Sequence, residues 1–228
     1  MRRFILLALM VVTVAGCDRF PDLSIQVTAN LKPTTNNCTV TADQEQLVSI
    51  GRYDRNYGGS YRIIPRIESY LVNNGLEFQG SQGNVQIESF ELTILLPDGT
   101  QPDFGDLPNP YTQGASSAVI PASTSPGTPS LGFATAIGIP ENYIGPVVDA
   151  LDSTGFDSIV LEIRANGKTA GGFSNQSPPF SWPVTFCSGC LGTTCEEPAM
   201  VGDPTDGSCL AGQDSWQYCA EITPAATP

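Results

Sequence analysis

The stretch that decides the fold is Ile159-Val160-Leu161-Glu162-Ile163-Arg164-Ala165-Asn166-Gly167. Its odd-numbered residues up to Ala165 are apolar and alternate with Val160, Glu162 and Arg164. A period of two predicts a β-strand with one buried face. Asn166-Gly167 then predicts a type I′ hairpin turn, because both turn positions need positive φ. The stretch therefore indicates an antiparallel β protein.

Several other segments show the same alternation and are predicted strands. Pro65, inside the second of them, indicates a sheet edge or a bulge. The apolar phase changes near Glu88-Ser89, which predicts a β-bulge. The segments are 23–29, 61–72, 85–94, 131–137 and 180–186.

A single helix is predicted after Pro140, which is suited to a helix start. Its apolar face consists of Ile144, Val147, Val148 and Leu151. Gly145-Pro146 in the middle predicts that this helix is short or broken. Residues 97–130 carry seven prolines and four glycines and predict a long irregular insertion with only a small strand at 118–120.

The strand signals together predict an all-β fold, an antiparallel two-sheet sandwich of immunoglobulin-like character, with a closed barrel as the alternative. The sandwich is expected to span residues 23–186, and a disulfide-rich C-terminal tail follows at 187–228. Glycine and proline number 23 and 19, which is typical of a loop-rich β protein.

The first seventeen residues form a distinct pattern. Met1-Arg2-Arg3 is basic, residues 4–15 are almost entirely apolar, and Val14-Ala15-Gly16-Cys17 closes the run. A run of twelve residues is too short for a membrane span, which needs about 20 apolar residues. The order is that of a bacterial secretion signal. Its end resembles the lipobox of bacterial lipoproteins, which signal peptidase II cuts before the cysteine.

This resemblance implies a signal peptide at residues 1–16, a covalent diacylglycerol and palmitate-type acyl lipid on Cys17, and a lipidated tether at 17–22. The protein would then belong to the cell envelope of a Gram-negative bacterium, in the inner or the outer membrane. Asp18 to Asp22 would reach less than roughly 20 Å, because one residue spans at most 3.3–3.6 Å. The domain is therefore expected close to its membrane.

The chain is acidic, with 10 basic and 23 acidic residues, no histidine and a net charge of −13. Removal of the leader would take away Arg2 and Arg3 and leave a net charge of −15. Such a charge argues against nucleic acid as a partner, because no broad basic surface is available for phosphates. It also predicts repulsion from anionic lipid headgroups.

Seven cysteines are present, and six remain for disulfides if Cys17 is acylated. Five of the six lie within 187–219, so complete pairing requires Cys38 to join one of them. The partner expected for Cys38 is Cys187 or Cys190, because the last strand ends there. Such a bond closes a very long loop and could contribute roughly 5 kcal/mol. The disulfide candidates are Cys38, Cys187, Cys190, Cys195, Cys209 and Cys219.

Other chemistry for these cysteines is less favoured. Cys187-Ser188-Gly189-Cys190 could be a redox CxxC motif, but no βαβ pattern places it at a helix start. A zinc site would lack histidine and regular spacing, and haem attachment needs a histidine where Leu191 stands. A structural disulfide framework is the preferred interpretation.

Catalytic residues are not predicted, and no cofactor beyond the acyl lipid is expected. A histidine-dependent triad is impossible. A glycan-directed hydrolase using two carboxylates remains the alternative, since it needs only a pair of acids. Asp98, Asp103 and Asp106 are weak calcium candidates, as is the group Asp203, Asp206 and Asp214; solvated turn residues are the preferred interpretation.

One basic segment stands out in the acidic chain. Four of the eight basic residues of the mature chain fall within fifteen positions, interleaved with three tyrosines. Arginine and tyrosine are typical of adaptable recognition loops. The hypothesis is a contact site for an envelope protein or glycan; the alternative is a polar loop whose arginines pair with carboxylates. The residues are Arg52, Tyr53, Arg55, Tyr57, Tyr61, Arg62 and Arg66.

The chain as a whole also resembles envelope lipoproteins of myxobacteria and their relatives. The resemblance rests on the lipobox, on 183–191 (PVTFCSGCL) and on 209–214 (CLAGQD). That group has no assigned activity to transfer. The sequence therefore predicts a membrane-anchored envelope lipoprotein with a binding or structural role, and a CxxC redox protein is the weakest alternative.

Overall fold

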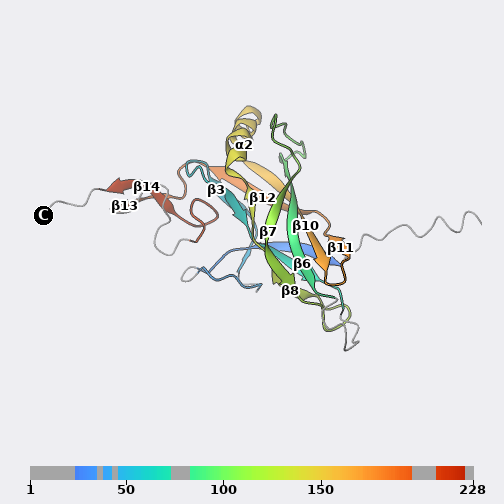
Figure 1. The fold of residues 1–228 in the computed structure, drawn as a ribbon. Helices are drawn as coiled ribbons and strands as arrows, with labels where there is room; N and C mark the ends of the chain where they lie inside the picture. The colour runs from blue at the N-terminus through green and yellow to red at the C-terminus, as the bar shows by residue number, and fades with distance from the viewer. Residues whose placement is uncertain (1–23, 35–37, 43–45, 73–82, 197–208, 224–228) are drawn as a thin grey trace, which may run out of the picture.

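The computed structural model describes residues 24–34, 38–42, 46–72, 83–196 and 209–223, and Figure 1 shows their arrangement. The predicted leader and tether, together with Asp203 and Asp206, lie outside the described residues. The described chain is all-β with one helix. Two curled sheets supply most of its strands.

The larger sheet has the strand order β3-β12-β10-β6-β7, and β11 pairs with the far end of β10. Most pairs are antiparallel, as predicted. The pair β3–β12 is parallel, so the prediction of a wholly antiparallel fold is wrong at this edge. The strands are β3 (Gly51–Asp54), β6 (Val85–Leu95), β7 (Tyr111–Ile120), β10 (Ser158–Thr169), β11 (Ser174–Gln176) and β12 (Phe180–Cys187).

The smaller sheet has the order β2-β1-β5-β8. A separate pair, β4–β9, continues the β5–β8 pairing on the other side of a bend at Ile64 and Ala134. Pro65 begins β5, an interior strand, so the sheet edge predicted there is wrong. The alternative prediction of a bulge agrees with the register shift in the β1–β5 pair between Val27 and Ala29. The chain bends before Pro65, whose carbonyl accepts a hydrogen bond from Ala134 N–H (3.3 Å). The strands are β1 (Ile25–Leu31), β2 (Leu47–Val48), β4 (Tyr61–Ile63), β5 (Pro65–Ser69), β8 (Ser130–Phe133) and β9 (Ala136–Ile139).

The inward faces of both sheets contribute to one hydrophobic core. Ile25 and Val27 of β1 and Ile67 of β5 belong to the same cluster as Leu92 of β6 and Leu161 of β10. This shared core is the reason for the period-two pattern of the sequence, because each strand must hide one face. The immunoglobulin-like character stays a prediction.

The prediction of a strand followed by a turn around β10 is only partly correct. The strand exists, but it runs through Asn166-Gly167, and the predicted turn at these residues is wrong. The hairpin turns later, where Gly172 N–H donates to Thr169 O (2.8 Å). Gly167 instead lies where β6 comes so close that a Cβ atom would be 2.8 Å from Gln86 O. The predicted bulge near Glu88-Ser89 is confirmed by a register shift on both sides of β6.

The helix α2 (Glu141–Thr154) starts after Pro140, as predicted, and buries Ile144, Val147 and Leu151. It is a continuous helix of 14 residues, so the prediction of a short or broken helix is wrong. Pro146 is the sixth residue of the helix, so it removes one hydrogen bond to the carbonyl of Asn142, but the helix continues through it. The insertion 97–130 also contains more structure than predicted, because β7 extends over ten residues.

The C-terminal part contains the short parallel pair β13 (Gly192–Glu196) and β14 (Tyr218–Thr223), which extends away from the sheets in Figure 1. Three disulfides join Cys38 to Cys209, Cys187 to Cys190, and Cys195 to Cys219. The prediction that Cys38 must join the C-terminal cluster is confirmed. The predicted partners, Cys187 and Cys190, are wrong because those two cysteines bond each other.

Candidate functional site

The tail segment 212–214 lies between β3 and β4, two strands that do not pair directly. On the β3 side, Asp54 N–H donates to Gly212 O (2.9 Å) and Asp214 N–H donates to Arg52 O (2.6 Å). A strand-like bridge joins Tyr53 to Gln213. We call this arrangement of β3, residues 212–214 and β4 the seam, because it closes the gap between the two strands.

The β4 side of the seam depends on one side chain. Gln213 Oε1 accepts a hydrogen bond from Arg62 N–H (2.8 Å), and Gln213 Nε2 donates to Arg62 O (2.9 Å). The amide thus replaces the main-chain partners that a neighbouring strand would supply. Sequence analysis gave no signal for this role, because a lone glutamine in a tail has no distinctive pattern.

Asp214 is buried at the inner side of the seam. Its Oδ1 accepts hydrogen bonds from Arg52 N–H (3.2 Å) and Tyr61 Oη (3.1 Å), and Trp182 Nε1 donates in turn to Tyr61 Oη (3.1 Å). Asp214 Oδ2 has no hydrogen-bond partner among the described residues. Burial raises the pKa of Asp214 to about 6, against the lowering by these hydrogen bonds and by the charge of Lys32. The preferred interpretation of Asp214 as a solvated turn residue is therefore wrong, because the carboxylate is buried, and the other two members of its calcium group lie outside the described residues.

A second, smaller apolar cluster anchors the tail. Leu210 and Trp216, on either side of the seam segment, pack against Leu31 and Ile64. The Cys38–Cys209 disulfide lies beside this cluster and links positions 171 residues apart. This explains the choice of partner for Cys38, since β1 ends at Leu31 where Leu210 packs, whereas Cys187 lies at the end of β12 beside Asp54.

The CxxC loop closes over Asp54, which is fully buried. Asp54 Oδ1 accepts from Gly189 N–H (2.8 Å) and Asn56 N–H (3.0 Å), and Oδ2 accepts from Leu191 N–H (2.8 Å). Asp54, Cys187 and Cys190 could hold a metal by distance alone. Both sulfurs are consumed by their disulfide, however, so the arrangement present is a loop fixed by a carboxylate.

The predicted interaction loop does not form one surface. Tyr53 and Tyr61 are fully buried and pack edge to face with ring centroids 6.3 Å apart, so their assignment as contact residues is wrong. Both occupy inward positions of β3 and β4, which the alternation within each short strand determines. Tyr57 is half-buried against Tyr218 (5.3 Å between centroids) and is largely part of the tail packing.

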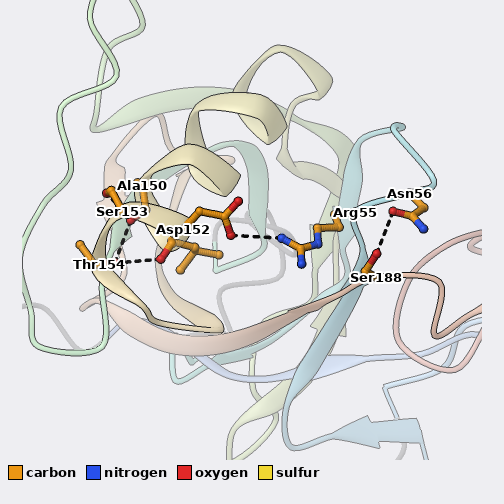
Figure 2. Close-up of polar contacts among 8 residues, drawn as sticks. Arg55, Asn56, Ala150, Asp152, Ser153, Thr154 and Ser188 are labelled. Carbon is orange, nitrogen blue, oxygen red and sulfur yellow. Dashed lines mark hydrogen bonds and ion pairs between the residues drawn. The ribbon is translucent and has the colours of Figure 1, made fainter.

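Two of the four arginines pair with carboxylates, which is what the alternative interpretation predicted. Arg55 and Asp152 of α2 are joined at 3.2 Å, and Figure 2 shows this ion pair between the turn after β3 and the helix. Asn56 accepts a hydrogen bond from Ser188 in the same view (3.1 Å). Arg66 lies away from this loop on β5 and pairs with Glu68 (3.2 Å).

The other two arginines, Arg52 and Arg62, are exposed on the outer face of the seam. They occupy the alternate positions to Tyr53 and Tyr61, so their side chains point away from the core. Among the described residues neither side chain has an ion pair or a hydrogen bond. The seam segment lies between them, because Asp214 hydrogen-bonds the main chain of Arg52 and the Gln213 side chain hydrogen-bonds the main chain of Arg62.

A groove of about 300 Å³ adjoins Arg62. It runs from the tail to the place where Ser116 N–H of β7 donates to Thr135 O (2.7 Å). Ile137, 40% exposed, stands at its rim. The lining combines one cation, two hydroxyls and apolar side chains, with Arg62, Ile64, Ser116, Thr135, Ile137 and Leu210 among its residues.

Among the described residues, the acids named as calcium candidates do not gather at one ion position. Asp98 Oδ1 and Asp103 Oδ1 accept hydrogen bonds from the main-chain N–H groups two residues on (2.9 Å each). Together with Asp106 they are exposed turn residues, and no shared ion position joins them. Asp103 and Asp149 line another hollow, of about 490 Å³, but both are exposed.

Comparisons with known proteins leave the chain without a family. No protein-family model matches it, and no curated protein matches it. Among solved structures, one match is the X-ray structure of a Northeast Structural Genomics Consortium target, with 8% identity and a TM-score of 0.32 over 72% of this chain and 88% of that chain. No inference is drawn from a likeness at that level.

Two features bear on the compartment. Three disulfides in one chain are typical of an oxidising, non-cytoplasmic location. Within the residues that the structure describes, no helix has the length and apolarity to cross a membrane.

Proposed function

We propose that this protein is an envelope lipoprotein, anchored through an acyl lipid on Cys17, and that it binds an anionic envelope component at the outer face of the seam. The lipobox pattern and the three disulfides support the anchoring and the export. The binding role rests on one observation. Arg52 and Arg62 flank the seam without a partner among the described residues, although the chain has 23 acidic residues and only 10 basic ones.

Unpaired arginines suit an anionic ligand because the planar guanidinium can donate two parallel hydrogen bonds to a carboxylate or a phosphate. Lys32 adds a third positive charge near the seam, since its charge acts on the Asp214 carboxylate. The position is also well fixed. The Cys38–Cys209 disulfide and the Gln213 hydrogen bonds hold the segment between the two arginines.

The groove beside Arg62 indicates what else the ligand carries. The hydroxyls of Ser116 and Thr135, which hydrogen-bond each other (2.7 Å), lie in its lining, and Ile137 offers an exposed apolar face. A volume of about 300 Å³ is at the small end of ligand sites and accommodates a sugar ring or a short peptide segment. We therefore favour a glycan bearing carboxylate or phosphate groups, and an acidic peptide is the second choice.

The anchoring is tested first, by mass spectrometry of protein extracted from its own membrane. We expect a mature chain that begins at Cys17 and carries acyl groups. The Cys17→Ser variant should lose its membrane association. Recovery of the intact leader, or of an unmodified Cys17, would overturn this part of the proposal.

The binding role is tested with an Arg52→Gln/Arg62→Gln variant of the full chain. The matched control is Arg55→Gln/Arg164→Gln, which removes the same charge from two arginines that pair with Asp152 and Glu91. The probes are soluble peptidoglycan fragments and the phosphorylated core oligosaccharide of lipopolysaccharide. We expect the seam variant to bind at least one probe about tenfold more weakly than the control, which corresponds to about 1.4 kcal/mol.

Two results would contradict the binding proposal. An equal loss of affinity in both variants would show that net charge, and not the position of Arg52 and Arg62, accounts for binding. Failure of the unaltered protein to bind either probe would exclude the glycan class, and an acidic peptide library would then decide whether the arginines bind anything.

A further inference from the structure

The end of the molecule where the described chain begins has a composition unlike the rest. Ser24 Oγ donates to Asn175 Oδ1 (2.8 Å), and Ser24 O accepts from Tyr70 N–H (2.9 Å). Ala170 N–H and Ala122 N–H both donate to Asn84. These bonds join the start of β1, the end of β5, the start of β6, the end of β7 and the β10–β11 hairpin at one end, which we call the entry end.

No charged side chain occurs among the described residues of the entry end, which are 24–25, 70–72, 83–85, 120–130 and 169–175. The opposite end, built from 96–110, α2 and 155–157, contains seven acidic residues: Asp98, Asp103, Asp106, Glu141, Asp149, Asp152 and Asp157. Figure 1 shows α2 well away from β8 and β11. Acidic residues are therefore concentrated at the end of the domain opposite the entry end.

The entry end also presents the most exposed large apolar side chain among the described residues. Phe173 is 75% exposed at the tip of the β10–β11 hairpin. Its position is fixed by the backbone, because Phe173 N–H donates to Thr169 Oγ1 (3.1 Å) and Phe173 O accepts from Thr169 N–H (2.9 Å). The ring is held outward on a fixed hairpin, and transfer of its apolar surface from water into an apolar environment is favourable.

We propose that the entry end rests on the surface of the lipid bilayer and that Phe173 enters its headgroup region. The inference depends on the acylation of Cys17 proposed above. Seven residue steps separate Cys17 from Ser24, a reach of about 25 Å at most. The entry end is therefore the part of the described domain that the tether holds nearest the bilayer.

Charge decides the orientation as well. Anionic headgroups repel carboxylates, so the end with seven acids faces away from the bilayer, and the entry end, whose described residues carry no charged side chain, faces it. Contact through Phe173 and neutral side chains needs no anionic lipid. This separates the bilayer from a charged protein partner and predicts that the contact is insensitive to salt and to the anionic lipid content.

The test uses the full acylated chain in vesicles of phosphatidylethanolamine and phosphatidylglycerol, with and without brominated acyl chains that quench tryptophan fluorescence. The reporter is Phe173→Trp. The matched control is Ile50→Trp, because Ile50 is also exposed (51%) but follows β2, which pairs with the far end of β1. The native Trp182 and Trp216 are buried and common to both variants.

We expect brominated lipid to quench the fluorescence of the Phe173→Trp variant, equally at low and high salt. The Ile50→Trp variant should be quenched no more than the unaltered protein. Quenching of both variants would indicate an unoriented domain, and quenching of neither would place the entry end in water. Either result overturns the inference while leaving acylation intact. If the protein does not stay with the vesicles at all, mass spectrometry of Cys17 shows whether the proposed function itself has failed.

Discussion

The two edges of β3 are held in different ways. On one side, β12 pairs with it through a regular main-chain ladder from Val184–Gly51 to Cys187–Asp54. On the other side, the seam joins it to β4 through three tail residues and the side chain of Gln213. The ladder belongs to the large core, whereas the seam is supported by a small apolar cluster and a disulfide.

This difference teaches how a tail becomes part of a fold. A ladder repeats along a strand, so each hydrogen bond supports the next, and the buried side chains beneath it supply most of the stability. The seam has few bonds and a carboxylate oxygen without a partner among the described residues. Its persistence therefore depends on loop closure by Cys38 and Cys209.

The largest effect is expected from Cys38→Ser/Cys209→Ser. Opening a loop of 171 residues should lower the free energy of unfolding by roughly 5 kcal/mol in the chain-entropy model. Native-state hydrogen exchange should show the amides of Asp54, Arg62 and Asp214 losing more protection than those of β10. The control is Cys195→Ser/Cys219→Ser, which opens only a 24-residue separation in the β13–β14 arm. Equal deprotection of β10 and the seam would contradict the comparison.

A core truncation should come next. Leu161→Ala, in the fully buried centre of β10, is expected to lower the free energy of unfolding by about 4 kcal/mol through lost burial and a cavity. Leu210→Ala, in the small cluster beside the seam, should cost about 2 kcal/mol because its surroundings can relax. Urea unfolding curves measure both. A larger loss at Leu210 would show that the seam, and not the ladder, limits stability.

Asp214→Asn should remove a pH dependence. The pKa of Asp214 is raised to about 6 in the folded protein, above its ordinary value of 3.8, so the folded state binds the proton more tightly. The protonated carboxyl therefore makes its full contribution to the free energy of unfolding below about pH 4. This contribution, about 3 kcal/mol, is lost as the pH rises through 6. Urea unfolding at pH 4 and pH 7 should show this loss in the unaltered protein and not in the variant. Parallel pH profiles would contradict the burial of this carboxylate.

The smallest effect is expected from Gln213→Ala. Gln213 is buried (1% exposed), so its truncation leaves Arg62 N–H and O without their amide partner, and the cost should be about 1–2 kcal/mol. The control Gln176→Ala removes an amide that is exposed and bonded to Asn166, and it should cost almost nothing. Thermal unfolding compares the two. No difference between them would mean that Gln213 contributes nothing to closing the seam.

Local pattern was sufficient for much of the fold. The alternation in β10 and β12, the bulge in β6 and the helix start at Pro140 were all predictable, because each depends on neighbours in sequence. Asn166-Gly167 was misleading for a physical reason. Glycine serves a tight turn and a close backbone approach equally well, and only the position of β6 decides between them.

The candidate site was only half predictable. The segment containing Arg52 and Arg62 was identifiable by composition, but composition could not separate these arginines from the buried Tyr53 and Tyr61. Which side chains face the core is set by the alternation within β3 (four residues) and β4 (three residues). Strands this short do not show a reliable period of two in the sequence. Asp214 and Gln213 gave no signal for their role in the seam, because their partners lie more than 150 residues away.

By itself the sequence determined the β class, the one helix and the need for Cys38 to reach the C-terminal cysteines, because periodicity and parity are properties of the chain alone. The tertiary structure alone decided that Cys209 is the partner, that the tail fills the gap between β3 and β4, and that Arg52 and Arg62 are left facing solvent. Each of these depends on which distant segments share one small volume, and that is set by packing around the common core.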